Sequence, residues 1–275
     1  MPELPETETI ARDLQRAVAG ARIAGVTVTH ADVLRETTPA KLRRALVGAT
    51  IDRCWRRAKL VVLDLSTASR LAVQPRFTGA LLIDTGTLPE RERAYSTLAL
   101  RLADGRVLHY RDIRRLGTVT LMSPDRWARH EATLGVEPLD PAFTATHLSG
   151  ALRGSSQAVK KLVMDQRRIA GLGNIYANEA LWRAGIDPSR AGRTIRADEV
   201  ARLRRAIVGV LRASIDARGT SFRDYRDASG ERGSFAAMLD VYGRGGERCH
   251  RCGGRLLATD AIDGRTTVLC PRCQR

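Results

Sequence analysis

The spacing of apolar residues changes along the chain, and each change predicts a different kind of structure. Near the N-terminus, Ile10, Leu14 and Ala17 or Val18 recur at helical spacing before Gly20, which predicts a helix over residues 7–19. Beyond it, between residues 23 and 122, the pattern becomes a series of short β-type runs. These runs cover residues 60–65, 71–74, 80–83, 98–102, 107–110 and 117–122. The pattern predicts an antiparallel sandwich or barrel, with a hairpin turn at Asp104-Gly105.

The second half of the chain has helical periodicity. Two helical runs, 162–165 and 175–184, flank the turn Gly171-Leu172-Gly173-Asn174. A glycine-rich turn before a helix offers backbone N–H groups that suit a phosphate, although such a turn alone is weak evidence. A later i, i+4 stripe ends at Gly219. It consists of Leu203, Ile207, Leu211 and Ile215.

The length of the chain predicts more than one domain, because 275 residues exceed the usual size of one domain, about 100–150 residues. We expect an N-terminal domain over residues 1–130 and a turn-rich linker over 131–146. A helical domain should follow over 147–235, and a C-terminal module over 236–275. The fold class is therefore α+β.

The charge balance points to a polyanionic partner. Lys and Arg number 46 against 30 acidic residues, which gives a formal net charge of +16. Each phosphate that such a surface neutralises releases counterions and favours binding, although charge alone also fits a ribosomal protein. No apolar run reaches the roughly 18–20 residues of a membrane span. Acids at positions 3, 6 and 8 do not fit a signal peptide, so we expect a cytosolic protein that does not enter membranes.

Four of the five cysteines have the spacing of a metal site. Cys249-x2-Cys252 and Cys270-x2-Cys273 are separated by 17 residues, which is typical of a tetrahedral structural zinc. Disulfides are the alternative, but a cytosolic setting disfavours them. Four sulfur ligands leave no open position, so one Zn²⁺ would fold the tail and perform no chemistry. Cys54 is left over, and we expect it to be a small buried hydrophobe at a strand edge.

The first residues offer a candidate nucleophile. If Met1 is removed, the chain starts at Pro2, whose secondary amine lies close in sequence to Glu3 and Glu6. An α-amino group titrates at roughly 7.7–8.0 in model compounds, so a useful fraction is uncharged at neutral pH. Such an amine can add to a sugar aldehyde carbon and form an iminium intermediate. The plainer interpretation is that prolines and glutamates simply begin a helix.

Taken together, these segments resemble the formamidopyrimidine-DNA glycosylase family, the Fpg/Nei group of base-excision repair enzymes, over essentially the whole chain. The resemblance rests on motifs that occur in register along the sequence. They are Pro2-Glu3-Leu4-Pro5-Glu6, Arg56-Arg57-Ala58-Lys59, Tyr110-Arg111-Asp112-Ile113-Arg114-Arg115-Leu116-Gly117, Met164-Asp165-Gln166, Gly171-Leu172-Gly173-Asn174-Ile175-Tyr176-Ala177-Asn178-Glu179 and Val241-Tyr242-Gly243-Arg244.

The resemblance implies an N-terminal β-sandwich domain with an N-terminal helix, a helix-two-turn-helix domain and a zinc-finger hairpin, with duplex DNA in a cleft. It implies a glycosylase that flips out a damaged base and an abasic-site lyase that cuts the strand by β/δ-elimination. Pro2 then looks like the nucleophile, Glu3 the group that manages protons at the sugar, and Glu6 its support. Lys59 looks like a catalytic-site lysine near the lesion, although an exposed lysine beside basic neighbours is the plainer interpretation.

The same resemblance implies the DNA contacts. Asn174, Tyr242 and Arg265 look like phosphate contacts, with Arg265 in the loop between the zinc knuckles. Residues 220–235 resemble the loop that Fpg-type members fold over an oxidised purine, which favours 8-oxoguanine and formamidopyrimidines as substrates; an ordinary linker is the alternative.

Two positions depart from the Fpg pattern. The family commonly has Met in the segment that is matched here by Arg76-Phe77-Thr78-Gly79, and Phe where this chain has Leu116. With Arg114 and Arg115, Phe77 and Leu116 are candidates for filling the gap that a flipped base leaves, and their alternative is a place in the sandwich core. The departures lie at positions that bear on the opposite-base preference and the lesion range.

The expected partner is double-stranded DNA that contains oxidised bases or abasic sites, bound by a monomer. The expected location is the bacterial cytoplasm, in association with the nucleoid. A Nei-type enzyme for oxidised pyrimidines and a non-catalytic zinc protein that binds damaged DNA are the alternative functions.

Overall fold

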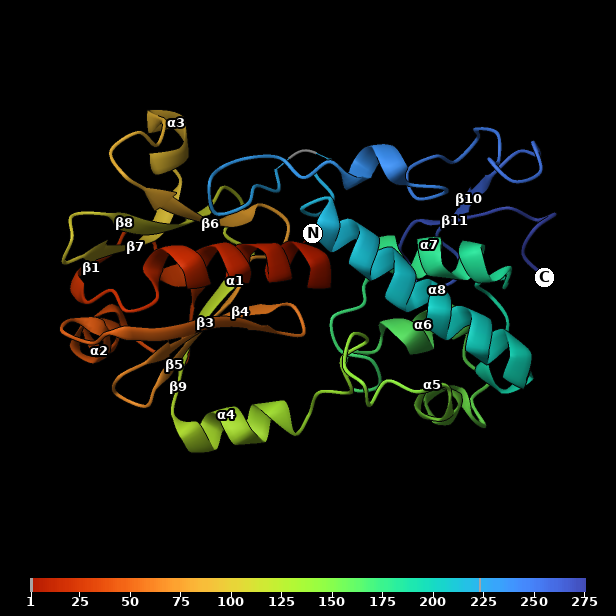
Figure 1. Ribbon diagram of the computed structural model, residues 1–275, viewed down its shortest axis with the longest axis horizontal. Helices are drawn as coiled ribbons and strands as arrows, with labels where there is room; N and C mark the ends of the chain where they lie inside the picture. Colours follow the sequence, from red (N-terminus) through yellow and green to blue (C-terminus); the bar gives the residue numbers. More distant parts are fainter. Residues whose placement is uncertain (1, 223) are drawn as a thin grey trace. The chain divides into compact units, whose positions relative to one another are not determined.

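The protein folds into two compact units. A computed structural model describes residues 2–222 and 224–275 (Figure 1). The first unit joins Met1–Ala132 to Ala217–Ala236, and the second joins Thr133–Asp216 to Ala237–Arg275. Met1, whose removal we expect, and Arg223, in the expected substrate-covering loop, lie outside the described residues.

Two β-sheets make up most of the first unit (Figure 1). Within the described residues, one sheet has the strand order β1-β7-β8-β6 and the other has the order β2-β9-β5-β4-β3. All the pairings in them are antiparallel except the short β2–β9 pair, which is parallel. The elements are α1 (Leu4–Val18), β1 (Ile23–Val28), η1 (Ala31–Val33), β2 (Leu34–Arg35), α2 (Pro39–Leu46), β3 (Ile51–Arg57), β4 (Leu60–Leu65), β5 (Arg70–Gln74), β6 (Gly79–Asp84), α3 (Glu90–Arg93), β7 (Ser96–Leu102), β8 (Val107–Asp112), β9 (Thr118–Met122) and α4 (Pro124–Glu131).

The core of this unit lies between the two sheets. Leu63 and Leu71 from the five-stranded sheet meet Leu81 and Leu98 from the four-stranded sheet in one buried cluster. Because alternate residues of a strand point to opposite faces, each sheet contributes one apolar face. The α1 helix adds its own buried stripe and runs beside β3. The sandwich expected from the sequence is confirmed.

The predicted elements of this unit differ from the observed ones mainly at their edges. The predicted β-runs lie in strands except for Gly117, which precedes β9, and Asp104-Gly105 turns between β7 and β8, with Gly105 at φ +92°. The α1 helix begins at Leu4 rather than at residue 7, because Pro5 occupies its first turn and the Glu6 carboxylate accepts a hydrogen bond from the Glu3 N–H.

The edge strand β3 contains both polar and apolar residues, so a search for apolar runs in the sequence does not find it. The expectation that Cys54 is buried is confirmed: Cys54 is 4% exposed and lies in this outer strand of its sheet. Burial, followed by the nearby Asp64 carboxylate, raises the pKa of the Cys54 thiol to about 12. The thiol is therefore protonated and unreactive at neutral pH.

The second unit is helical with a small hairpin at its C-terminal end. Its elements are α5 (Ala145–Leu152), α6 (Val159–Met164), α7 (Asn174–Ala184), η2 (Gly192–Thr194), α8 (Ala197–Asp216), β10 (Leu257–Thr259) and β11 (Thr267–Leu269). The two helical runs and the apolar stripe expected from the sequence lie in α6, α7 and α8, and α7 packs against α8 (Figure 1). Leu203, Ile207 and Leu211 are fully buried. Gly219 follows α8 at φ +88°, a conformation that suits glycine.

The segment after α8 returns to the first unit and leads into η3 (Phe235–Met238). The backbone N–H of Ile83, in the outer strand β6, donates a hydrogen bond to the carbonyl of Ala228. Arg218 forms ion pairs with Asp13 of α1 and with Asp227. The sequence grouped residues 217–235 with the helical domain, whereas these contacts join them to the sandwich.

A search of residues 2–222 and 224–275 finds no helix with the length and apolar character needed to cross a membrane.

Candidate active site

The N-terminal end of α1 holds the candidate nucleophile and its carboxylates. Pro2 is buried, and Glu3 and Glu6 are 2% and 1% exposed. The Oε2 atom of Glu6 accepts a hydrogen bond of 2.8 Å from the Glu3 N–H, and its Oε1 atom accepts one of 2.8 Å from the Thr220 N–H. One carboxylate thus fixes the backbone next to Pro2 and joins it to the segment 217–236.

That segment packs tightly against α1. The Tyr225 hydroxyl donates a hydrogen bond of 3.4 Å to the carbonyl of Glu6. A Cβ atom at Gly219 would lie 3.1 Å from Cγ of Glu6, and the backbone there has a positive φ. Only glycine fits this position without strain. The loop expected to cover a flipped base is therefore anchored at the N-terminal residues themselves.

Lys59 lies in the tight turn between β3 and β4 and is 8% exposed. The turn puts Ala58 in the left-handed region, at φ +52°. Arg56 supports it by donating to the Ala58 carbonyl at 3.1 Å and by pairing at 2.8 Å with Glu8 of α1. Burial opposes ionisation of Glu8, but the guanidinium groups of Arg56 and Arg12 together outweigh it and hold the pKa of Glu8 below its ordinary value. The Lys59 turn is thereby fixed to the same helix as Glu3 and Glu6.

Two turns of the sandwich present exposed apolar side chains. Phe77 precedes β6 and is 49% exposed, and Leu116 precedes β9 and is 37% exposed. Neither side chain belongs to the core. The Arg114 guanidinium carbon lies 5.3 Å from the centroid of the Phe77 ring. Arg115 instead pairs with Asp32 at 3.1 Å, so its charge is already partly engaged.

In the second unit, the first turns of α7 organise the three candidate phosphate contacts. The Asn174 Nδ2 donates to the carbonyl of Thr266 at 3.0 Å, one residue from the exposed Arg265. Glu179, fully buried, accepts three backbone hydrogen bonds from residues 240–242, including one of 2.8 Å from the Tyr242 N–H. Asn174, Tyr242 and the turn with Arg265 are therefore held by one helix.

A buried lysine supports the same turn. Lys160 of α6 is fully buried, and its Nζ donates to Asp263 at 3.1 Å and to the Thr267 hydroxyl at 2.7 Å. Asp263 also accepts a hydrogen bond from the Arg265 N–H. Sequence reasoning missed Lys160, because a lysine in a short helix, next to a second lysine, carries no signal of the distant acid that it pairs with.

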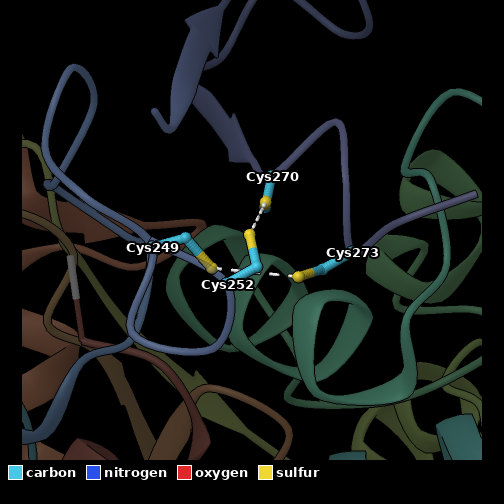
Figure 2. Close-up of side chains that lie close together, drawn as sticks. All are labelled: Cys249, Cys252, Cys270 and Cys273. Atoms are coloured by element: carbon cyan, nitrogen blue, oxygen red, sulfur yellow. Dashed lines mark hydrogen bonds between the residues drawn. The ribbon is translucent and has the colours of Figure 1, made fainter. Parts of the chain in front are cut away.

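The four spaced cysteines converge in one cluster (Figure 2). Their sulfur atoms all lie within 4.8 Å of one another, with Cys249 and Cys273 at 4.0 Å and Cys252 and Cys270 at 3.4 Å. Ligands at about 2.3 Å around a tetrahedral Zn²⁺ would be separated by about 3.8 Å, whereas a disulfide needs about 2.05 Å. The cluster fits a metal and holds no disulfide. Val268, Leu256 and Trp182 of α7 form the small core beside it.

The sequence therefore pointed to the candidate site residues, but not to the hydrogen bonds and ion pairs that hold them in place. Pro2, Glu3 and Glu6 come together at one helix end, and the four cysteines come together at another site. Sequence reasoning missed Glu8, Asn178 and Glu179 as supports, although Asn178 and Glu179 stand within a motif that carried the resemblance. The DNA-contacting and catalytic roles of the individual residues stay predictions.

Comparison with known proteins identifies the class of this architecture. Residues 1–119 match the formamidopyrimidine-DNA glycosylase N-terminal domain, residues 134–226 match the formamidopyrimidine-DNA glycosylase H2TH domain, and residues 246–275 match the zinc finger found in FPG and IleRS. The order of these three modules defines a zinc-finger protein of the DNA glycosylase type.

Relatives and solved structures agree with this class over the full length. The formamidopyrimidine-DNA glycosylase of Pelotomaculum thermopropionicum is 39% identical, with 100% of this chain and 99% of that one covered. The corresponding protein of Moorella thermoacetica is 42% identical over 92% of each chain. A Lactococcus lactis FPG variant in complex with Fapy-dG containing DNA superimposes with a TM-score of 0.91 at 32% identity, covering 100% of each chain. The chain belongs to the formamidopyrimidine-DNA glycosylase family, and its four clustered cysteines are the site of a single structural zinc.

Zinc binding predicts that the five cysteine thiols fall into two classes by their reactivity. We expect one zinc per chain by metal analysis. After chelation the finger should unfold and its four thiols should react rapidly with a thiol reagent, while Cys54 should react slowly because it stays buried in the sandwich core. Cys54→Ala should keep one zinc per chain, and Cys270→Ser should bind it far more weakly. A reduced protein without zinc, or five equivalent thiols, would contradict the assignment.

Proposed function

We propose that this protein is a bifunctional DNA glycosylase and abasic-site lyase that removes oxidised purines from duplex DNA. The expected substrates are 8-oxoguanine and formamidopyrimidines. The observation that carries the proposal is the full-length match to formamidopyrimidine-DNA glycosylases, with a Pro-Glu pair buried at the helix end where the reaction would begin. Lactococcus lactis FPG in complex with DNA that contains an abasic site, with a TM-score of 0.90 at 31% identity over 99% of each chain, supports the abasic-site part of the proposal.

In the proposed reaction, the Pro2 nitrogen attacks C1′ of the damaged nucleotide. The bond between C1′ and the base breaks, and the base leaves with the electron pair and takes up a proton. Glu3 exchanges protons with the opening sugar, and the product is an iminium at C1′. Loss of a C2′ proton then expels the 3′ phosphate, and a second elimination expels the 5′ phosphate. Water hydrolyses the remaining iminium and releases Pro2.

The supporting residues would act on geometry. Glu6 holds the Glu3 backbone and the start of segment 217–236 through its two oxygens, so substrate covered by that segment would meet Pro2 and Glu3 in a fixed arrangement. Lys59, in its strained turn, would place a cation near the lesion and its phosphate. A preset site reduces the entropy that must be lost during the reaction.

Recognition of the duplex would divide into two kinds of contact. In the second unit, Asn174, Tyr242 and Arg265 would contact phosphates, which position DNA without reading sequence. In the first unit, Phe77 and Leu116 would fill the gap left by the flipped base, and Arg114 would hydrogen-bond the orphaned partner base. Arg115, paired with Asp32, would contribute mainly charge.

Two further parts of the proposal concern the range of substrates and the place in the cell where the enzyme works. One Lactococcus lactis FPG structure, with a TM-score of 0.90 and 31% identity over 100% of each chain, contains DNA with an oxidised pyrimidine, so oxidised pyrimidines are a second candidate substrate. We propose that the enzyme works as a monomer in the cytoplasm, on the DNA of the nucleoid.

Borohydride trapping tests the proposed nucleophile. The mature protein should be trapped on duplexes that contain 8-oxoguanine or an abasic site, and more weakly on those with oxidised pyrimidines. Pro2→Gly should retain some trapping through its primary amine, whereas a chain extended before Pro2 should trap nothing. Full trapping by the extended chain would exclude Pro2, and no trapping by the mature protein on any substrate would favour a non-catalytic binding protein.

Salt dependence tests the phosphate role of Arg265. Arg265→Ala should weaken binding of all duplexes by a similar factor and reduce the slope of log K against log salt by about 1. Arg272→Ala, which removes the same charge from another exposed position of the finger, should change the slope less. A loss confined to one lesion would show that Arg265 reads a base.

Substrate choice tests the role of Phe77. Base stacking on an aromatic ring is worth about 1–3 kcal/mol, so Phe77→Ala should slow excision from duplex DNA by about tenfold or more. Cleavage of a preformed abasic site should change much less. Val47→Ala shortens another side chain with 49% exposure in the same unit and is the control. Equal loss of both activities together with lower thermal stability would instead make Phe77 structural.

A further inference from the structure

The two exposed turns share an unusual backbone feature. Arg76 and Arg115 adopt positive φ angles of +34° and +51°, and each directly precedes an exposed apolar residue. Such conformations cost about 1–3 kcal/mol for a residue with a side chain, and they persist only where the surroundings enforce them. The residues around the two turns must therefore hold Arg76 and Arg115 in these conformations.

A buried hydrogen-bond network joins the two turns. Thr78, 4% exposed, follows Phe77 in the first turn, and Asp112, 2% exposed, begins the second turn. The Thr78 hydroxyl donates to Oδ1 of Asp112 and accepts a hydrogen bond of 3.0 Å from the Arg114 N–H. One hydroxyl therefore connects the residue after Phe77 with the backbone of Arg114.

The other carboxylate oxygen of Asp112 fixes the far end of the second turn. Its Oδ2 atom accepts 2.8 Å and 3.1 Å hydrogen bonds from the Gly117 N–H and the Tyr110 hydroxyl. A side chain at Gly117 would overlap the Tyr110 hydroxyl and lie 2.6 Å from the carbonyl of Gln74. The Asp112 carboxylate is thus hydrogen-bonded at both oxygens, and it ties Thr78 of the first turn to Gly117 at the end of the second.

We propose that Thr78 and Asp112 are positioning residues that hold the turns of Phe77 and Leu116 as one rigid unit. This inference rests on the proposed function. It assigns to the pair the task of presenting Phe77, with Arg114 stacked on its ring, in the orientation needed when a base leaves the stack. Neither residue touches DNA in this role; both act through the residues beside them.

The pair also explains how the two departures from the family pattern are accommodated. This chain carries its aromatic side chain in the first turn and an aliphatic one in the second. An exposed ring on a loose turn would lose rotational and backbone freedom on entering the DNA, and that loss would oppose insertion. Thr78 directly follows Phe77, and its hydroxyl is bonded to Asp112 and to the Arg114 N–H, so this cost is met during folding.

The test compares Thr78→Val with Thr78→Ser. Valine keeps the shape and removes the hydroxyl, whereas serine keeps the hydroxyl. We expect Thr78→Val to slow single-turnover excision of 8-oxoguanine from duplex DNA by about tenfold, with KM and cleavage of a preformed abasic site changed less than twofold. Thr78→Ser should stay within twofold of the unmodified protein. Thr78→Ala gives the same expectation should the valine variant fail to fold.

Two controls separate positioning from general stability. Tyr110→Phe removes a hydrogen bond from the same carboxylate without cutting the tie between the turns, so excision should change less than twofold. In a double-mutant cycle, Thr78→Val should have less than a twofold effect on excision when Phe77 is already alanine, because it acts through that side chain.

The outcomes are distinct. Full excision activity in Thr78→Val, equal loss of excision and abasic-site cleavage, or additive effects with Phe77→Ala would each overturn the inference. Absence of excision by the unmodified protein on every duplex would instead overturn the proposed function. A 2-aminopurine placed beside a non-cleavable abasic analogue adds a direct readout: the fluorescence rise on binding should be reduced in Thr78→Val and retained in Thr78→Ser.

Discussion

The first unit depends on the two oxygens of one buried carboxylate. Glu6 accepts from the Glu3 N–H with one oxygen and from the Thr220 N–H with the other, across 214 positions of sequence. A buried charged acceptor is costly unless its lone pairs are satisfied, so both donors must be in place when the unit folds. The consequence is that the start of α1 and the segment after α8 are ordered together. The proposed chemistry at the N-terminus and the proposed covering of substrate by that segment would therefore depend on the same carboxylate.

The second unit repeats this arrangement with α7. Glu179 binds three consecutive N–H groups of residues 240–242, and Asn178 accepts from the Val268 N–H in the hairpin. Burial, partly offset by those N–H groups, raises the pKa of Glu179. The zinc is thus only one of several ties on the hairpin. Lys160, from a different helix, holds the turn of Arg265 directly, so the metal would stabilise a position that buried side chains also define.

The sequence predicted the sandwich, the helical half and the metal ligands because each has a local or regular pattern. The strands 60–65 and 98–102 can be recognised by their largely apolar residues, and the metal-binding cysteines by their spacing. The strand β3 was missed because an edge strand with polar neighbours has no such run. The grouping of segment 217–236 with the sandwich was missed for another reason. Its contacts with the sandwich join distant residues, such as Arg218 and Asp13, which lie 205 positions apart, and no periodicity encodes a single long-range ion pair.

Strained backbone conformations in this protein lie close to hydrogen bonds and ion pairs that hold them. Of the six non-glycine residues with positive φ in the described chain, four lie in the Lys59 turn, the turns of Phe77 and Leu116, and segment 217–236: Ala58, Arg76, Arg115 and Arg218. Each has a polar tie close by. Arg56 donates to the Ala58 carbonyl, the Thr78–Asp112 pair joins the turns of Arg76 and Arg115, and Arg218 pairs with Asp13 and Asp227. Since each strained position costs about 1–3 kcal/mol, removing a nearby tie should let its turn relax before the unit unfolds. Loss of function without loss of fold is therefore the expected signature of damage at these supports, because the sandwich core is built from other residues.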